Sequence, residues 1–376
     1  MLKATRPMRI LLASDKFKGS LSAQGVAKSC RKALEKVFPE AIFDVCPIAD
    51  GGEGTTEAMV TALGGQWRET TVLDAQARPR LAHFGWIPAE RLAVMEMSAA
   101  SGLAIVSDLP LAPERASTFG TGELLLAAQA QGAERIILGI GGSATNDGGL
   151  GVAVALGWKF YRADGSSFQP TLATVLEAIR VERPATPHPA ILVACDVDNP
   201  LLGPRGATRV YGPQKGVRDF AWFETRLDHL ARLAVAAGAG DHRDVPGAGA
   251  AGGLGFGLLA FAGAQLTSGF DLVAAQVGLA ERVRQADLVL TGEGRIDEQS
   301  LQGKGPVGVA KLARAQGKKV IGVAGSVGEA PGLRACFDLL IGVKPADMPL
   351  DEAMRRTDEL IATALAARAD ALRALR

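Results

Sequence analysis

The chain has 376 residues, which is enough for two domains of ordinary size. Hydrophobic residues make up 48% of it and charged residues 22%, as is usual in a soluble globular protein. Lysine and arginine total 41 against 40 aspartate and glutamate residues, and the resulting net charge of +1 gives no reason to expect nucleic acid or an anionic membrane as a partner.

The cysteines and histidines do not form a metal-binding pattern. There are four of each, they are scattered, and no CxxC pair occurs. Residues 1–7 are too short and polar for a signal peptide. Residues 245–270 carry no charge, but their eight glycines favour a loop leading into a buried helix over a membrane span. We therefore expect a cytoplasmic protein with reduced thiols and no membrane partner, either as a monomer or as a homo-oligomer.

Short β-branched runs alternate along the chain with longer alanine- and leucine-rich runs of helical periodicity. This alternation is typical of an α/β fold with mainly parallel strands. The expected strands are 9–13, 42–47, 92–97, 135–140, 190–194, 287–291, 319–324 and 339–343. The expected helices are 22–37, 53–63, 122–131, 171–179, 219–236, 254–264, 307–316 and 351–375.

Residues 70–86 differ from their surroundings, because their short alternating runs indicate a hairpin and a change of domain. We expect two different α/β domains. The first is Rossmann-like, with a mainly parallel sheet, and combines residues 1–72 and 286–376. The second, residues 73–285, is inserted into the first.

Glycines and acidic residues gather directly after predicted strands, where the loops of an open parallel sheet bind ligands. After the first strand, Asp15 and Lys18 precede a helix start, at which backbone N–H groups favour anions. After the second strand, Asp50, Gly51 and Glu53 lie in a glycine-rich loop whose carboxylates suit Mg²⁺ or substrate hydroxyl groups. The alternative is a solvated strand-to-helix turn for the first loop and a glycine-rich turn before a helix for the second.

The richest loop covers residues 139–149 and follows the strand at 135–140. Its small residues let the backbone approach a ligand closely, and successive N–H groups can form a phosphate-binding nest. Its hydroxyl and carboxylate groups can serve phosphates and a metal ion. The candidates in this loop are Gly141, Gly142, Ser143, Thr145, Asn146 and Asp147.

Two further loops place acids after strands. Asp196 follows the strand at 190–194 and is expected to project into a cleft. Glu293, Arg295 and Asp297 follow the strand at 287–291, and the guanidinium group suits bidentate contact with a carboxylate or phosphate. Ser98 belongs to another loop of small residues.

Two segments, 247–252 and 303–308, match GxGxxG, but neither directly follows a predicted strand. A dinucleotide-binding site is therefore weakly indicated. Gly252 and Gly253, which open a helix, can still cap a phosphate. The chain lacks GxxxxGK[ST], HRD, DFG, GxSxG and HExxH, which argues against P-loop enzymes, protein kinases, serine hydrolases and zincins.

Seven segments occur in order over nearly the whole chain: DKFKGSLSA, PIADGGEGT, GIGGSATNDGG, CDVDNPLLGP, YGPQKG, GAAGGLGFGLLAF and LTGEGRIDEQSLQGK. Together they resemble the bacterial glycerate kinase family of type I, known for glycerate 2-kinases. The resemblance implies ATP-dependent transfer to D-glycerate, giving 2-phosphoglycerate, with Mg²⁺. It also implies an active site in the cleft between two α/β domains. Lys16 stands where many relatives carry serine, so Lys18 is the better catalytic candidate.

Phosphoryl transfer depends on positioning and charge neutralisation, and the roles expected here follow from that requirement. The catalytic candidates are Asp15, Lys18, Asp196 and Arg295. The glycerate-binding candidates are Asp50, Gly51, Glu53, Ser98, Glu293 and Asp297. The nucleotide-binding candidates are Gly141, Gly142, Ser143, Thr145, Asn146, Gly252 and Gly253, and the metal candidates are Asp147 and Asp196.

Three alternatives stay open from the sequence. The chain can be a kinase for another small hydroxy acid or sugar, a non-catalytic nucleotide sensor, or, on the GxGxxG matches alone, an NAD-dependent oxidoreductase. The choice between 2- and 3-phosphoglycerate, the stereochemical preference and the oligomeric state are open as well.

Overall fold

The computed structural model describes residues 6–302 and 305–376, and this part of the chain divides into two compact units. Unit 1 consists of the chain up to Asp50 together with Glu57–Gly64 and Phe270–Arg376. Unit 2 consists of Gly51–Thr56 and Gly65–Gly269. Each unit has its own sheet and its own hydrophobic core, as expected of a domain. The expected fold class, two different α/β domains, is confirmed.

The boundaries between the units differ from the predicted ones, which lay after residues 72 and 285. The strands of the hairpin, β3 (Gln66–Leu73) and β4 (Pro79–Ile87), pair from Gln66 with Trp86 to Leu73 with Pro79, and both belong to unit 2. Helix α10 (Leu279–Gln285) belongs to unit 1. It is held there by Arg282, whose Nη1 donates to an Asp44 carboxylate oxygen at 2.5 Å.

The central strands of the unit 1 sheet are rich in buried aliphatic residues. Within the described residues it has five parallel strands in the order β14-β13-β12-β1-β2. The chain forms β2 on one side of β1 and later returns to form β12 on the other side, so the strand order reverses between β1 and β12. Such a reversal leaves a crevice at the carboxyl ends of the strands. The strands are β1 (Arg9–Leu12), β2 (Ile42–Val45), β12 (Leu288–Ile296), β13 (Lys319–Val327) and β14 (Leu339–Gly342).

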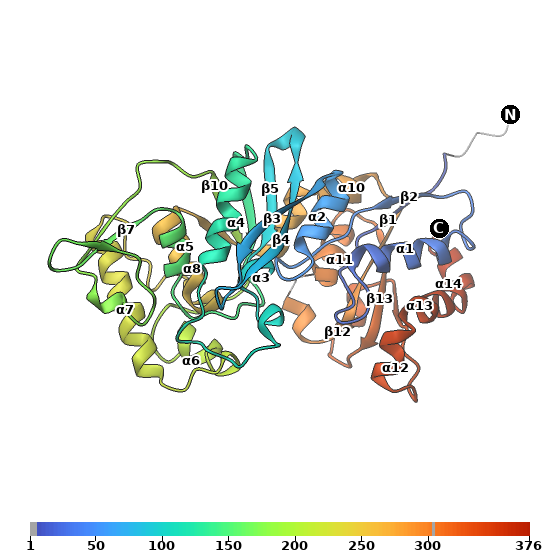
Figure 1. Ribbon diagram of the computed structural model, residues 1–376. Helices are drawn as coiled ribbons and strands as arrows, with labels where there is room; N and C mark the ends of the chain where they lie inside the picture. The colour runs from blue at the N-terminus through green and yellow to red at the C-terminus, as the bar shows by residue number, and fades with distance from the viewer. Residues whose placement is uncertain (1–5, 303–304) are drawn as a thin grey trace. The chain divides into compact units, whose positions relative to one another are not determined.

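The first helix of unit 1 begins where its sequence predicted. The Oγ of Ser22 accepts a hydrogen bond from the N–H of Gly25 at 3.2 Å and so caps α1. The helix expected over 351–375 is instead three short helices, because the backbone at Arg356 and Arg368 leaves helical geometry. Helix α1, near the start of the chain, packs against α13, near its end (Figure 1). The helices are α1 (Ala23–Leu34), α2 (Thr55–Leu63), α9 (Gly269–Gln276), α10, α11 (Gly305–Ala315), α12 (Leu350–Arg355), α13 (Thr357–Ala366) and α14 (Ala369–Arg373).

Unit 2, all of whose residues are described, is built on a six-stranded mixed sheet in the order β11-β10-β6-β5-β4-β3. The four strands from β11 to β5 are parallel, and the hairpin adds β4 and β3 in antiparallel fashion. A separate small antiparallel sheet, β8-β7-β9, has no counterpart among the predicted strands. The remaining strands are β5 (Leu92–Glu96), β6 (Arg135–Gly139), β7 (Lys159–Tyr161), β8 (Ser167–Phe168), β9 (Arg180–Glu182), β10 (Ala190–Ala194) and β11 (Gln265–Thr267).

The helix predicted over 171–179 is wrong, since only a short 3-10 turn, Val175–Glu177, forms there. The Thr174 Oγ1 accepts a hydrogen bond from the N–H of Thr171 at 3.0 Å, a local bond that competes with helix formation. The helices of unit 2 are α3 (Ser98–Ser101), α4 (Phe119–Ala130), α5 (Leu150–Ala155), α6 (Ala207–Tyr211), α7 (Phe220–Ala236) and α8 (Ala250–Ala262). Among the described residues no helix is both long and apolar enough to cross a bilayer.

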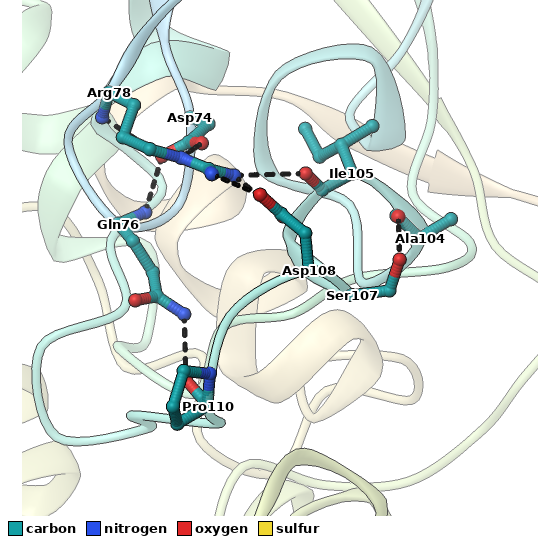
Figure 2. Close-up of polar contacts among 8 residues, drawn as sticks. All are labelled: Asp74, Gln76, Arg78, Ala104, Ile105, Ser107, Asp108 and Pro110. Atoms are coloured by element: carbon teal, nitrogen blue, oxygen red, sulfur yellow. Dashed lines mark hydrogen bonds and ion pairs between the residues drawn. The ribbon is translucent and has the colours of Figure 1, made fainter.

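The turn of the hairpin is held by one arginine, Arg78 (Figure 2). Its guanidinium group donates to Asp74 at 2.6 Å, to Asp108 at 2.6 and 3.1 Å, and to the carbonyl of Ile105 at 3.1 Å. Asp74 also accepts the backbone N–H groups of Gln76 and Arg78, which closes the turn. The hairpin is thereby tied to the loop that follows α3.

Candidate functional site

A pocket of about 410 Å³ opens in unit 1 at the place where the strand order reverses. It lies at the carboxyl ends of β1, β12, β13 and β14, and its walls are formed by the last residues of β12 and β13, by the segments after β1 and β14, and by α12 and α13. It brings together five candidates that the sequence predicted from three separate motifs. Its charged lining residues are Asp15, Lys16, Lys18, Asp50, Glu293, Arg295 and Lys344.

Two carboxyl groups of this pocket have unusual proton affinities. Asp15 is only 8% exposed, and burial together with the charge of Asp50 raises its pKa to about 7. The backbone N–H of Lys16 donates to Asp15 Oδ1 at 2.6 Å and holds the side chain in place. Burial and the charges of Asp50 and Asp297 raise the pKa of Glu293 to about 7 as well. Each group can therefore exchange a proton near neutral pH.

The positive charges of the pocket are more accessible. Lys18 is exposed, and the Arg295 side chain is 73% exposed. Arg295 Nε lies 2.8 Å from a carboxylate oxygen of Asp297, so this predicted pair of residues forms an ion pair. An exposed ion pair contributes little to stability and exchanges readily for another anion. The geometry thus leaves Arg295 able to bind a carboxylate or a phosphate.

The pocket fits Mg²⁺ only as an ion that is shared with a ligand. In the described part of the chain no group of three or more His, Cys, Asp or Glu residues is arranged to hold a metal ion. Magnesium in phosphotransferases is usually held by one or two carboxylates together with substrate phosphates. Asp50 and Glu293 meet that requirement, because the charge of Asp50 contributes to the raised pKa of Glu293 and a cation would relieve this repulsion.

In unit 2 the glycine-rich loop is accessible only at its start. Gly141 and Gly142 are exposed, whereas Ser143, Thr145 and Asn146 are buried. The Gly142 carbonyl accepts the N–H of Leu103 at 2.8 Å, which ties the loop to the segment after α3. A phosphate nest built from the whole loop is therefore not favoured, and the exposed glycines are its remaining candidates.

A buried lysine outside the predicted set supports this loop from within. Lys215 is 1% exposed, and its Nζ donates to Ser143 Oγ at 2.7 Å and to the Thr145 carbonyl at 2.6 Å. Burial lowers the pKa of Lys215 to about 7. A neutral amine has two N–H donors, and the loop supplies two acceptors for them. Lys215 therefore fixes the conformation of residues 143–145.

The sequence predicted Asp147 as a metal ligand, but in the structure its carboxylate is enclosed and accepts hydrogen bonds from the protein. It is 2% exposed, and burial raises its pKa. One oxygen accepts the N–H and Oγ1–H of Thr118 at 2.8 and 2.9 Å and the N–H of Gly151 at 3.2 Å, and the other accepts the N–H of Gly149 at 3.1 Å. Both oxygens are thus engaged in joining the loop to the starts of α4 and α5.

Gly252 and Gly253 are buried and allow close packing of the backbone, so they do not form an exposed helix start. Both are buried and have positive φ, 71° and 86°. A Cβ on Gly252 would lie 2.0 Å from the Thr145 carbonyl oxygen, and one on Gly253 would lie 2.9 Å from the Cα of Gly148. The structure therefore assigns these glycines to the close approach of α8 to the glycine-rich loop, which argues against the predicted contact with a nucleotide.

The remaining candidates of unit 2 lie at the carboxyl ends of its parallel strands. Gly51 is buried where a Cβ would lie 2.5 Å from that of Ala194, the last residue of β10. Glu53 is exposed in the same loop, Ser98 is half-buried at the start of α3, and Asp196 is half-buried after β10. Asp196 Oδ1 accepts the N–H of Gly269 at 3.1 Å.

Sequence reasoning missed several residues of these two sites. Lys344 and Ser326 line the pocket of unit 1 and could have been found as polar residues at the carboxyl ends of predicted strands. Glu96 in unit 2 accepts the N–H groups of Gly54 and Thr56, both at 3.0 Å, and so holds the loop around Glu53. Of the second GxGxxG match, Gly303 and Lys304 lie outside the described residues.

Comparison with known proteins identifies the family. The glycerate kinase family model matches residues 10–373. A glycerate kinase of Halalkalibacterium halodurans is 42% identical over 94% of this chain and 95% of its own length. The glycerate 2-kinase of Escherichia coli K12 is 43% identical over 93% of both chains.

A solved structure agrees over almost the whole chain. The crystal structure described as that of a glycerate kinase 2 from Salmonella typhimurium LT2 superposes with a TM-score of 0.87, at 38% identity, covering 98% of this chain and 99% of that one. This chain therefore belongs to the glycerate kinase family and is a kinase enzyme.

Proposed function

We propose that this kinase transfers the γ-phosphoryl group of MgATP to D-glycerate and that 2-phosphoglycerate is the product. The relatives named glycerate kinase and glycerate 2-kinase support the acceptor. The observation that carries the proposal is the pocket of unit 1. It places acidic groups with a pKa of about 7 beside the cations Lys18 and Arg295.

Asp15 is the proposed general base of the reaction. An attacking hydroxyl group must lose its proton as the new O–P bond forms, and a carboxylate with a pKa near the working pH is well suited to accept it. Lys18 and Arg295 would neutralise the glycerate carboxylate or the charge on the transferred group. Asp50 and Glu293 would hold Mg²⁺, which when bound neutralises charge on the phosphates.

The unit 2 candidates keep narrower proposed roles. Gly141 and Gly142 would offer backbone N–H groups to phosphate oxygens. Asp196 would orient the acceptor or ligate a magnesium ion, and Ser98 and Glu53 would contact substrate hydroxyl groups. Ser143, Thr145 and Asn146 would act by shaping the loop.

The decisive test is a coupled assay of ADP release from ATP, with D-glycerate, L-glycerate, other hydroxy acids and sugars as acceptors. We expect release that depends on D-glycerate and that stops when magnesium is chelated. Phosphorus NMR of the product should show 2-phosphoglycerate. A 3-phosphoglycerate signal would refute the proposed regiochemistry. ADP release at the same rate with and without each acceptor would refute glycerate as the substrate.

A further inference from the structure

One wall of the unit 1 pocket is apolar, which the proposed chemistry does not use. It is formed by Phe17, by Val343 directly after β14, and by α12 and α13. Leu350 in this wall is 65% exposed, the highest fraction among the exposed large hydrophobic side chains of the described residues. The apolar lining residues are Phe17, Val343, Leu350, Ala353, Met354 and Leu360.

Glycerate cannot account for this wall. Each of its three carbons carries oxygen, so it has no apolar face to bury, and it would fill only a small part of a pocket of about 410 Å³. An exposed leucine and a methionine at the edge of a concave site are typical of a surface that covers a ligand. The pocket is thus built for a molecule that is apolar at one end and anionic at the other.

The charges and the topology narrow the ligand class. Lys16, Lys18, Arg295 and Lys344 line the same pocket, so a polyanion is favoured at its polar end. The pocket lies at the strand-order reversal, the position at which parallel α/β sheets bind nucleotides. A purine ring supplies the flat apolar surface, and its phosphates supply the negative charge.

We propose that the wall containing Val343, Leu350 and Met354 binds the nucleobase and ribose of the phosphate donor. This inference rests on the proposed use of ATP. It places the nucleoside in unit 1, whereas sequence motifs alone pointed to the glycine-rich segments of unit 2.

The wall is fixed to the loop that carries the cations. Ser20 Oγ, which follows Lys18 by two residues, donates to the Met354 carbonyl at 2.7 Å and lies 2.5 Å from Thr357 Oγ1. Gly19 has a φ of 74°, and a Cβ there would lie 2.7 Å from the Met354 Cε. The absence of a side chain at Gly19 therefore lets the methionine rest on the loop, so the apolar and cationic parts are held together in advance of binding.

The test is to remove apolar surface without changing charge, in the variants Leu350→Ser and Met354→Ser. ADP affinity is measured by calorimetry, and the KM values for ATP and D-glycerate are measured by ADP release. Ile42→Ser is the matched control, because Ile42 is an exposed hydrophobic residue of the same unit outside the pocket. Inorganic tripolyphosphate is a second probe, since it carries the phosphate charge without a nucleoside.

We expect each wall variant to lower the affinity for ADP and to raise the KM for ATP, each by roughly tenfold. The KM for D-glycerate and the inhibition by tripolyphosphate should not change. The control should behave as the wild type. Equal ADP affinity in wild type and wall variants would overturn the inference while leaving the proposed function intact. A wild type that neither binds ADP nor uses ATP would instead refute the proposed function.

Photolabelling of the wild-type enzyme with 8-azido-ATP gives a readout that does not depend on variant folding. The label should appear within residues 335–360, and excess ADP should suppress it. Labelling confined to unit 2 would contradict the inference. So would an apolar effector, or a second copy of the chain, that occupies the wall and is not displaced by ADP.

Discussion

Asp15, the proposed general base, occupies a position at which the charge of its side chain opposes stability. Its pKa is raised from 3.8 to about 7, chiefly by burial and then by Asp50, so the folded protein binds its proton more tightly than the unfolded chain does. Between about pH 4 and pH 7 the folded state therefore holds more protons, and stability falls as the pH rises through this window. The same shift makes Asp15 a suitable base near neutral pH.

The change Asp15→Asn should separate these two effects. At pH 8 we expect kcat to fall at least about 10²-fold, while the free energy of unfolding rises by on the order of 1 kcal/mol because an ionised buried group is gone. The measurements are steady-state kinetics and denaturant unfolding from pH 5 to pH 8. Lys28→Ser serves as a control, since Lys28 is exposed on α1 and does not line the pocket. If Asp15→Asn instead lowers the free energy of unfolding at pH 8, the buried charge of Asp15 does not destabilise the folded protein, and the prediction is wrong.

Lys215 is another buried titratable residue with a defined structural contact. Its pKa is lowered from 10.5 to about 7 by burial, so above pH 7 the folded protein binds fewer protons than the unfolded chain. Stability should therefore gain from Lys215 as the pH rises from about 7 to 10. Its hydrogen bonds to Ser143 and Thr145 are available from the neutral amine.

Replacing Lys215 by methionine should leave two buried oxygens without donors and destabilise the protein by about 1–3 kcal/mol. The pH-dependent gain above pH 7 should disappear with it. Lys159→Met is the matched control, since Lys159 is the other lysine of unit 2 and is exposed. Chemical unfolding at pH 7 and pH 9 measures both effects, and an unchanged pH slope would rule out titration of Lys215 in this range.

At the scale of elements, the β3–β4 hairpin depends on its turn. Ala77 has a φ of 64°, an uncommon conformation for a residue with a side chain, and the contacts of Arg78 and Asp74 hold the turn around it (Figure 2). The alternating sequence predicted the hairpin, but the tie from Arg78 to Asp108 joins residues that are 30 positions apart and has no local signal.

Arg78→Ala should loosen the hairpin without affecting the pocket of unit 1. We expect a fall in Tm of roughly 2–4 °C and faster amide exchange at the turn, because three acceptors lose their donor. ADP affinity should stay at the wild-type value. Ala77→Gly is expected to raise Tm slightly, since glycine adopts positive φ without strain. Exchange rates equal to those of the wild type would mean that the turn is held by other contacts.

Helices and strands were predicted correctly where hydrophobic residues form a clear run or periodic pattern in the sequence. The predictions failed where local hydrogen bonds or tertiary contacts determined the secondary structure. All five strands of unit 1 were predicted, because each contains a short run of hydrophobic residues. The strands β7–β9 were missed, since two or three residues carry no period. The helix predicted over 351–375 forms as three short helices, and these place Leu360, Ile361, Leu365 and Leu372 in the core of unit 1.

For the molecule as a whole, the two units differ in chain continuity. Apart from Gly51–Thr56, unit 2 is one segment, Gly65–Gly269, and the residues of its main core cluster lie within it. Unit 1 is assembled from three segments. We expect the fragment 65–269 to fold alone, with cooperative thermal unfolding by circular dichroism, and a fragment of 270–376 to remain unfolded. A non-cooperative transition in the first fragment would show that it requires the rest of the chain.

The sequence by itself determined the α/β class, the hairpin, the loops that carry the chemistry and the family. These depend on short-range periodicity and on motifs that can be read along the chain. Only the tertiary structure decided which motif residues share a pocket and that Asp147, Gly252 and Gly253 are enclosed. It also showed that Lys215 hydrogen-bonds to the glycine-rich loop and that Met354 lines the pocket of unit 1. Burial and proton affinity depend on neighbours that lie tens to hundreds of residues away, and no local pattern in the chain records them.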